Sequence, residues 1–414
     1  MRLQTRMVMT LGVVGATVPW LWTRYASAGR AAPMALSQVL AQGPVARPEG
    51  ASPRPIAAPV EGFEPGRMRF QAGLGRFVTG LPAGRRAVLT VEPAWQRGTV
   101  ALMARHQIPR AGVVVLDTAT GRVLVYASYG GDGGDLARSV DPPAASVFKI
   151  VTASALLQHG LGERDTTCWS GGFHGLTMRE LIADPRRDRE CSTIGEAFAR
   201  SINTVFARRA LEFLRPDTVA ESARQWGFGE EVPFDARVPP SGYHIPTETL
   251  PFARTAAGFW NSHLSPLHGA LLAQGIALGG EMLRPWVIDR IEGPTGQVIQ
   301  AGGARPWRRS VPPEVAEALG RAMLRTVSEG TARTAFHDSA GRAYLPDIVV
   351  GGKTGTLTGR EPNSAYTWFV GNAEGAGRRL SLAVMVANGP LWRVRAPTLA
   401  RQVLQVAFRG RSSD

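Results

Sequence analysis

Residues 141–157 read Asp-Pro-Pro-Ala-Ala-Ser-Val-Phe-Lys-Ile-Val-Thr-Ala-Ser-Ala-Leu-Leu. They predict a helix that opens at Ser146, directly after the two prolines, and carries Lys149 one turn further on. Because serine and lysine three residues apart share one helix face, a neutral lysine amine can take the serine proton. The first helical turn adds backbone N–H groups and the positive end of the helix dipole, which favour a developing oxyanion. The stretch therefore predicts a nucleophilic serine with a lysine base, and a serine that merely caps the helix is the alternative.

Lysine is almost absent from the rest of the chain. Of the 47 lysines and arginines, only Lys149 and Lys353 are lysines. Arginine cannot give up its proton, whereas the pKa of a lysine shifts readily on burial, so both lysines are candidate catalytic groups. The net charge of +14 would suggest nucleic-acid binding, but the basic residues are scattered along the chain. No nucleic-acid partner is therefore expected.

Two further motifs complete the candidate site. Lys353 lies in the stretch Gly-Gly-Lys-Thr-Gly-Thr at residues 351–356, on a predicted strand. The glycines permit a substrate backbone to approach the strand edge, where lysine and threonine can bind a carboxylate. Ser201-Ile-Asn203, in the helical middle of the chain, offers a hydroxyl that can relay a proton and an amide that can hold Lys149.

Strands are predicted at both ends of the folded part, with helices between them. Distant strands that enclose a helical middle imply one antiparallel sheet with an inserted helical subdomain, an α/β (α+β) fold. The predicted elements are strands at 86–91, 348–356, 365–371 and 380–387, a hairpin at 112–128, and helices at 95–106, 193–214, 266–278 and 396–408.

The N-terminal part predicts export. Residues 1–30 combine a basic start with an apolar run and read as a signal peptide or a signal anchor, and residues 31–66 as a Pro/Ala-rich flexible tether before the folded part at 67–414. Cys168 and Cys191 are either a disulfide, which suits an exported protein, or two free thiols. No metal site is expected, and the Gly/Asp run at 130–135 reads as a surface loop.

The three motifs, in this order, resemble those of the penicillin-binding protein transpeptidase domain. The likeness extends over roughly residues 87–407, and segments similar to the family include 142–149, 201–208, 264–268, 279–285 and 366–371. The resemblance implies an antiparallel sheet flanked by helices, with the site at the junction with a helical subdomain. It also implies a serine acyl-enzyme that needs no cofactor.

The resemblance assigns a role to each matching residue. Ser146 would form the acyl-enzyme and Lys149 would activate it, while Ser201 and Asn203 complete the proton relay. Lys353, Thr354 and Gly355 would support the relay and bind substrate, and Thr356 would contact the substrate carboxylate. The backbone N–H groups of Ser146 and Thr356 would form the oxyanion hole. One departure is Ala145, where many family members have glycine.

The expected activity is D,D-transpeptidation of D-Ala-D-Ala stem peptides by a target of β-lactams. Fewer than about seventy residues precede the domain, so the chain resembles a short, monofunctional class B-like member without a large N-terminal module, which would work with a separate glycosyltransferase. It would act outside the cytoplasm, either anchored to the inner membrane or secreted. A D,D-carboxypeptidase or endopeptidase, a β-lactamase and a β-lactam sensor are the alternatives, and Asn203 disfavours the β-lactamase because those enzymes generally place an aliphatic residue there.

Overall fold

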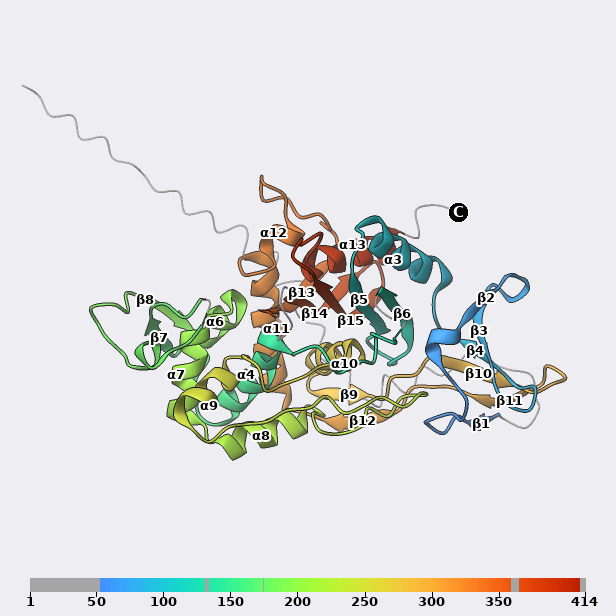
Figure 1. The fold of residues 1–414 in the computed structure, drawn as a ribbon, viewed down its shortest axis with the longest axis horizontal. Coiled ribbons are helices and arrows are strands. Elements are labelled where there is room, and N and C mark those ends of the chain that lie inside the picture. The colour runs from blue at the N-terminus through green and yellow to red at the C-terminus, as the bar shows by residue number, and fades with distance from the viewer. Residues whose placement is uncertain (1–52, 131–133, 174, 359–364, 410–414) are drawn as a thin grey trace, which may run out of the picture.

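The computed structural model describes residues 53–130, 134–173, 175–358 and 365–409 (Figure 1). The predicted export segment at 1–30 and most of the predicted tether lie outside these residues. Within the described ranges, no helix is both long enough and apolar enough to cross a bilayer.

Five antiparallel strands form the central sheet, in the order β13-β14-β15-β5-β6. β15 pairs with β5, with Val384 opposite Val113, so strands from the two ends of the folded chain lie side by side (Figure 1). This confirms the predicted antiparallel sheet built from distant segments. β13 forms one edge of the sheet. The strands are β5 Arg110–Asp117, β6 Val123–Gly130, β13 Val349–Thr358, β14 Ala365–Gly375 and β15 Arg378–Asn388.

Both faces of this sheet are covered, which explains why the interiors of β5 and β15 are largely apolar. Successive residues of β15 alternate between two core clusters, with Leu382 and Val384 in one and Ala383 and Met385 in the other. The first cluster packs under α3 (Pro93–Arg105) and α13 (Ala396–Arg409), and the second packs under α10 (Pro266–Ala277). The sheet is therefore the middle layer of three.

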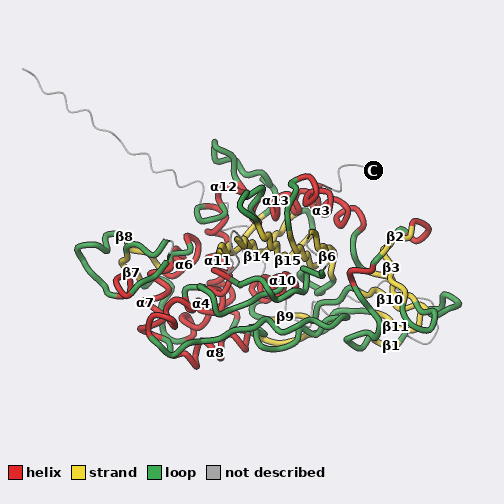
Figure 2. Tube along the Cα trace, viewed as in Figure 1, coloured by secondary structure: helices red, strands yellow, loops and turns green. Residues whose placement is uncertain are grey.

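The helical subdomain differs from its prediction at one point that matters for the site. The expected single helix at 193–214 is two helices, α6 (Ile194–Arg200) and α7 (Asn203–Phe213), because Ser201 adopts a left-handed conformation with φ 56° and ends α6. Apolar spacing alone could not reveal this break, since the periodicity resumes directly after it. The other helices of this side are α4 Lys149–Gln158, α5 Met178–Leu181, α8 Pro216–Gln225, α9 Thr249–Ala256 and α11 Pro313–Ser328 (Figure 2).

A second sheet lies on the opposite side of the central sheet from the helical subdomain (Figure 1). The strand predicted at 86–91 belongs to it as β4, so the expectation of one sheet was incomplete. Its order is β1-β11-β10-β4-β3-β2. The strands are β1 Arg54–Pro55, β2 Arg69–Gln71, β3 Arg76–Gly80, β4 Arg86–Leu89, β10 Ile288–Glu292 and β11 Val298–Ala301.

The end of the predicted tether, residues 54–66, is part of this fold. β1 pairs in parallel with β11, and the side chains of Ile56 and Phe63 are 1% and 3% exposed. These two apolar side chains anchor the segment, so residues 54–66, which the sequence assigned to the tether, belong to the described fold. The remaining short elements are the 3₁₀ helices Pro65–Arg67, Ala72–Leu74 and Ala145–Phe148, the helix α12 Arg333–Phe336, and the paired strands β9 Glu281–Leu283 and β12 Pro306–Arg309.

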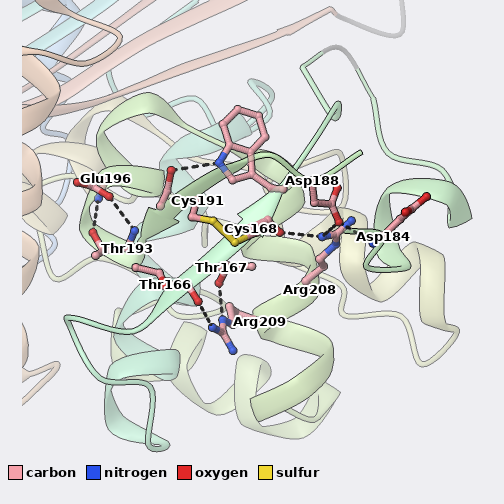
Figure 3. Close-up of a disulfide and its surroundings, with 12 residues drawn as sticks. Thr166, Thr167, Cys168, Asp184, Asp188, Cys191, Thr193, Glu196, Arg208 and Arg209 are labelled. Carbon is pink, nitrogen blue, oxygen red and sulfur yellow. Dashed lines mark hydrogen bonds and ion pairs between the residues drawn. A yellow bond between two sulfur atoms is a disulfide. The ribbon is translucent and has the colours of Figure 1, made fainter. Parts of the chain in front are cut away.

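A disulfide closes a hairpin in the helical subdomain. Cys168 on β7 (Thr166–Trp169) lies opposite Cys191 on β8 (Glu190–Thr193), and the two sulfurs are bonded (Figure 3). The sequence had left this pairing open. Arg208 of α7 donates to the Cys168 carbonyl and forms a buried ion pair with Asp188, with 2.7 Å between Nη1 and Oδ2. The hairpin is thereby fastened to α7.

Candidate active site

Ser146 begins the helical segment that the sequence predicted. It lies in a 3₁₀ turn over residues 145–148 that runs directly into α4, so Ser146 is partly exposed while Lys149 is fully buried. The Lys149 Nζ atom donates to the Ser146 Oγ atom over 2.9 Å. The nucleophile and the base candidate are therefore in direct contact.

Lys149 has two further oxygen partners. Its Nζ atom is 2.8 Å from Asn203 Oδ1 and 2.6 Å from the Ala257 carbonyl oxygen. A neutral amine has two N–H groups and one lone pair, and both of these oxygens can only accept a hydrogen bond. In a neutral Lys149 these two oxygens can take both N–H groups, and the lone pair then faces the Ser146 hydroxyl in place of the donated hydrogen.

The surroundings of Lys149 favour that neutral form. Burial away from water lowers the pKa of Lys149 well below its ordinary value, and the nearby charge of Lys353 lowers it further. The face of the Phe206 ring lies 5.3 Å from Nζ and gives the ammonium only weak support. A lysine with a lowered pKa can act as a general base near neutral pH.

Ser201 and Asn203 flank the break between α6 and α7. The left-handed backbone at Ser201 ends α6, and Asn203 is the first residue of α7. Ser201 Oγ accepts from Lys353 Nζ over 3.1 Å, whereas Asn203 faces Lys149. The break therefore sends the two polar side chains of this motif to the two different lysines.

Lys353 is buried on the edge strand β13. Its Nζ atom donates to Ser201 Oγ and, over 2.9 Å, to the carbonyl oxygen of Thr354, and it lies 5.4 Å from the centre of the Phe198 ring. Burial lowers the pKa of Lys353 to about 7. It therefore exchanges its proton near neutral pH.

The rest of the strand motif borders the same space. Gly355 lies against the turn before Ser146, because a Cβ atom there would be 3.3 Å from the Ala145 Cβ atom. The Thr354 hydroxyl is hydrogen-bonded to the Thr331 hydroxyl over 2.5 Å, and the Thr356 side chain is exposed. The structure thus brings all eight sequence-predicted site residues to the junction of β13, α4 and the α6–α7 break.

Ala145 precedes the candidate nucleophile with a backbone conformation that would suit glycine. Its φ is 50°, in the left-handed region that disfavours any Cβ atom. Gly258 presses against the same backbone, since a Cβ atom there would lie 2.6 Å from the Ala145 carbonyl oxygen. The start of the helix is therefore held tightly from a neighbouring loop.

Sequence reasoning missed three participants of the site. The Ala257 carbonyl contacts Lys149, the Thr331 hydroxyl contacts Thr354, and the Gly172 carbonyl accepts from Asn203 Nδ2 over 2.7 Å. Two of these groups are backbone oxygens, which carry no side-chain signature.

Asp135, at the end of the Gly/Asp run at 130–135, makes its side-chain contacts outside this site. Residues 131–133 lie outside the described ranges, and the Asp135 carboxylate accepts from Tyr126 and Ser128 and pairs with Arg138. Among the residues that the structure describes, no group of three or more His, Cys, Asp and Glu side chains could hold a metal ion.

Comparisons with known proteins agree with the geometry. Peptidoglycan D,D-transpeptidase PbpA of Mycobacterium tuberculosis H37Rv is 26% identical over 387 residues, which cover 83% of this chain and 77% of the relative. PbpA of Mycolicibacterium smegmatis is 24% identical over 359 residues, which cover 77% and 71%. The structure of penicillin-binding protein A from M. tuberculosis, an imipenem acyl-enzyme complex, has a similar fold: the TM-score is 0.65 at 24% identity, over 77% of this chain and 78% of that one.

The family model of the penicillin-binding protein transpeptidase domain matches residues 111–405, more than half of the chain. This range contains both lysines and the three motifs around them. The chain therefore belongs to the family of penicillin-binding protein transpeptidase domains.

Proposed function

We propose that this chain is a peptidoglycan D,D-transpeptidase that acts through an acyl-enzyme on Ser146. The observation that carries the proposal is the environment of Lys149. Its nitrogen is 2.9 Å from the Ser146 hydroxyl, and its other two partners are oxygens that can only accept. The names of the relatives, peptidoglycan D,D-transpeptidases, support the same reaction.

In the acylation step, the Ser146 oxygen bonds to the carbonyl carbon of the penultimate D-Ala while its proton passes to Lys149. The bond to the terminal D-Ala nitrogen then breaks as that nitrogen receives a proton, and D-Ala leaves as the free amine. The backbone N–H groups of Ser146 and Thr356 would stabilise the oxyanion between these events. An amine from a second stem peptide then attacks the ester and regenerates the Ser146 hydroxyl.

Proton delivery to the leaving nitrogen is assigned to Ser201. Its hydroxyl is 3.1 Å from Lys353 Nζ, so a proton given to the substrate can be replaced from the lysine. Because the pKa of Lys353 is about 7, this lysine can supply and recover a proton near neutral pH. Asn203 does not carry this proton; it serves as a fixed hydrogen-bond acceptor for Lys149.

Substrate binding is assigned to β13, the edge strand. An edge strand has a row of backbone groups free for an added strand, and an extended stem peptide can pair there. Thr354, Gly355 and Thr356 lie along this edge, and the charge on Lys353 would attract the terminal carboxylate. β-Lactams, which carry a carboxylate and an acylating carbonyl, would occupy the same place.

The proposed place of action is outside the cytoplasm, with residues 1–30 either anchoring the chain to the inner membrane or removed on export. The Cys168–Cys191 disulfide supports an oxidising compartment. A separate glycosyltransferase would supply the glycan strands.

Labelling with a fluorescent penicillin, followed by peptide mapping and a chase in buffer, tests the mechanism. We expect a stable adduct on Ser146, no adduct in Ser146→Ala, and normal labelling in Ser139→Ala, a serine seven residues upstream whose hydroxyl bonds Asp141. An unlabelled but folded wild-type protein would overturn the proposal. Incubation of an acyl-D-Ala-D-Ala peptide with an amine then separates the activities, because an amide product marks a transferase and a free acid alone marks a carboxypeptidase.

A further inference from the structure

The two ends of the Asn203 amide make different contacts. Oδ1 accepts from Lys149 Nζ over 2.8 Å, and Nδ2 donates to the Gly172 carbonyl oxygen over 2.7 Å. A carboxamide that rotated by 180° would present an N–H donor to Lys149 instead. Such a donor would bind the lone pair that Lys149 needs for the Ser146 proton. Because the Gly172 carbonyl can only accept, it holds the amide in the orientation that keeps the lone pair free.

Gly172 is itself fixed by α7. The residue has φ 78°, and a Cβ atom added to it would lie 2.2 Å from the Thr204 hydroxyl oxygen. The Thr204 side chain is fully buried, and its hydroxyl is 3.2 Å from the carbonyl oxygens of Ser170 and Gly171. Thr204, the residue after Asn203, therefore holds the segment 170–172, which ends in the carbonyl that accepts from the Asn203 amide.

The disulfide hairpin closes this arrangement. Cys168 precedes Gly172 by four residues, and Cys191 is two residues before Thr193, the residue that caps α6. Arg208, one turn along α7 from Thr204, holds the Cys168 carbonyl and Asp188. The hairpin, whose last residue Thr193 and whose contact with Arg208 are drawn in Figure 3, thus links the chain leading to Gly172 to both helices that flank the Ser201–Asn203 break.

We propose that Gly172 and Thr204 are positioning residues for acylation, which fix the Asn203 amide so that it offers Lys149 an acceptor and never a donor. The inference rests on the proposed role of Lys149 as the base for Ser146. It gives the disulfide-tied hairpin a task in the reaction, since the hairpin holds the carbonyl on which the amide orientation depends.

The test is the pH dependence of acylation by a fluorescent penicillin in the full chain. Gly172→Ala should displace the carbonyl and lower the second-order acylation rate at least about tenfold. Acylation should fall at acid pH where Lys149 becomes protonated, and this fall is the acid limb of the pH profile. The Lys149 ammonium would also lose an acceptor, which lowers its pKa, so the acid limb should move to lower pH. Asn203→Asp should move the same limb to higher pH, because a carboxylate favours the ammonium.

Two variants control for simple damage to the loop. Gly175→Ala adds a Cβ atom with no heavy atom within 4 Å and should acylate as the wild type does. Adding Thr204→Ala to Gly172→Ala removes the clashing oxygen and should recover part of the lost rate.

A folded Gly172→Ala variant with the wild-type rate and acid limb would overturn the inference, and so would a lower rate with an unmoved limb. If that variant does not fold, Thr204→Val carries the test. It should lose several-fold in rate and shift the limb in the same direction, and an unchanged profile would overturn the inference. Labelling of Ser146 in the wild-type protein tests the proposed function separately, so failure of the inference can be told from failure of that function.

Discussion

The two lysines of the site are equally buried, yet their surroundings differ. Lys149 projects from a helix into three oxygen partners, whereas Lys353 projects from an edge strand toward one hydroxyl and a backbone carbonyl of its own strand. The charge of Lys353 lowers the pKa of Lys149 further, and the pKa of Lys353 stays near 7. Burial therefore favours the neutral form of both lysines, and the neighbouring charge favours it further for Lys149.

The difference indicates how one residue type can take two tasks. A lysine whose neutral form is favoured by burial and a neighbouring charge, and whose N–H groups have acceptors, can act as the base for Ser146. A lysine that keeps a proton near neutral pH can return it to Ser201 and attract a carboxylate. Burial supplies the lowered pKa in both cases, and the partners decide the task.

The largest expected effect is on the acylation rate, and it tests whether Lys149 acts as the base. Lys149→Arg should lower the acylation rate by about a thousandfold, because a guanidinium stays charged and cannot accept the Ser146 proton. Stopped-flow labelling with a fluorescent penicillin measures the rate. Acylation of this variant at the wild-type rate would show that Lys149 is not the base.

The next effect concerns stability on the Lys353 side. The folded pKa of Lys353, about 7, is below the unfolded value of 10.5, so the unfolded chain binds more protons between these pH values. The free energy of unfolding should therefore rise with pH over this window. Lys353→Met should stabilise the protein by roughly 3 kcal/mol at pH 7, with the gain fading toward pH 10.5. Chemical denaturation at several pH values checks this, and a destabilised variant would contradict it.

A smaller effect should sharpen the comparison. As the pH rises through about 7, wild-type Lys353 loses its charge, so the apparent affinity for penicillin carboxylate should fall. Lys353→Arg keeps its charge, so this alkaline limb should disappear while acylation at neutral pH falls only about tenfold. The concentration dependence of labelling from pH 6 to 9 separates affinity from rate. A retained limb would assign the titration to another group.

The smallest effect belongs to Ala145, the residue before Ser146. Ala145→Gly should relieve the left-handed strain at φ 50° and raise the free energy of unfolding by roughly 0.5–1 kcal/mol. Thermal or urea unfolding measures it. The alkaline limb assigned to Lys353 should not move, and a change there would mean that the two halves of the site are coupled through the backbone.

Much of the site could be predicted from the sequence because its side chains are rare and regularly placed. Two lysines in an arginine-rich chain marked both halves of the site, and helical spacing placed Ser146 beside Lys149. Apolar strands at the C-terminal end likewise predicted the central sheet, since a strand buried on both faces is apolar throughout.

The remainder depends on contacts that leave no pattern in the sequence. The Ala257 and Gly172 carbonyls are backbone groups. The left-handed conformation of Ser201 interrupts a stretch whose apolar spacing is helical on both sides of it. The anchors Ile56 and Phe63 are too widely spaced in a Pro-rich stretch to indicate a strand. Tertiary structure decided each of these features.

The pairing of β5 with β15 has a consequence for biosynthesis. Val113 meets Val384, so nearly the whole chain must be made before the central sheet can close. Contacts of such long range fold slowly, and partly made chains expose sheet edges that invite aggregation. Because the candidate site lies at the edge strand of this sheet, it becomes complete only after β15 has joined β5.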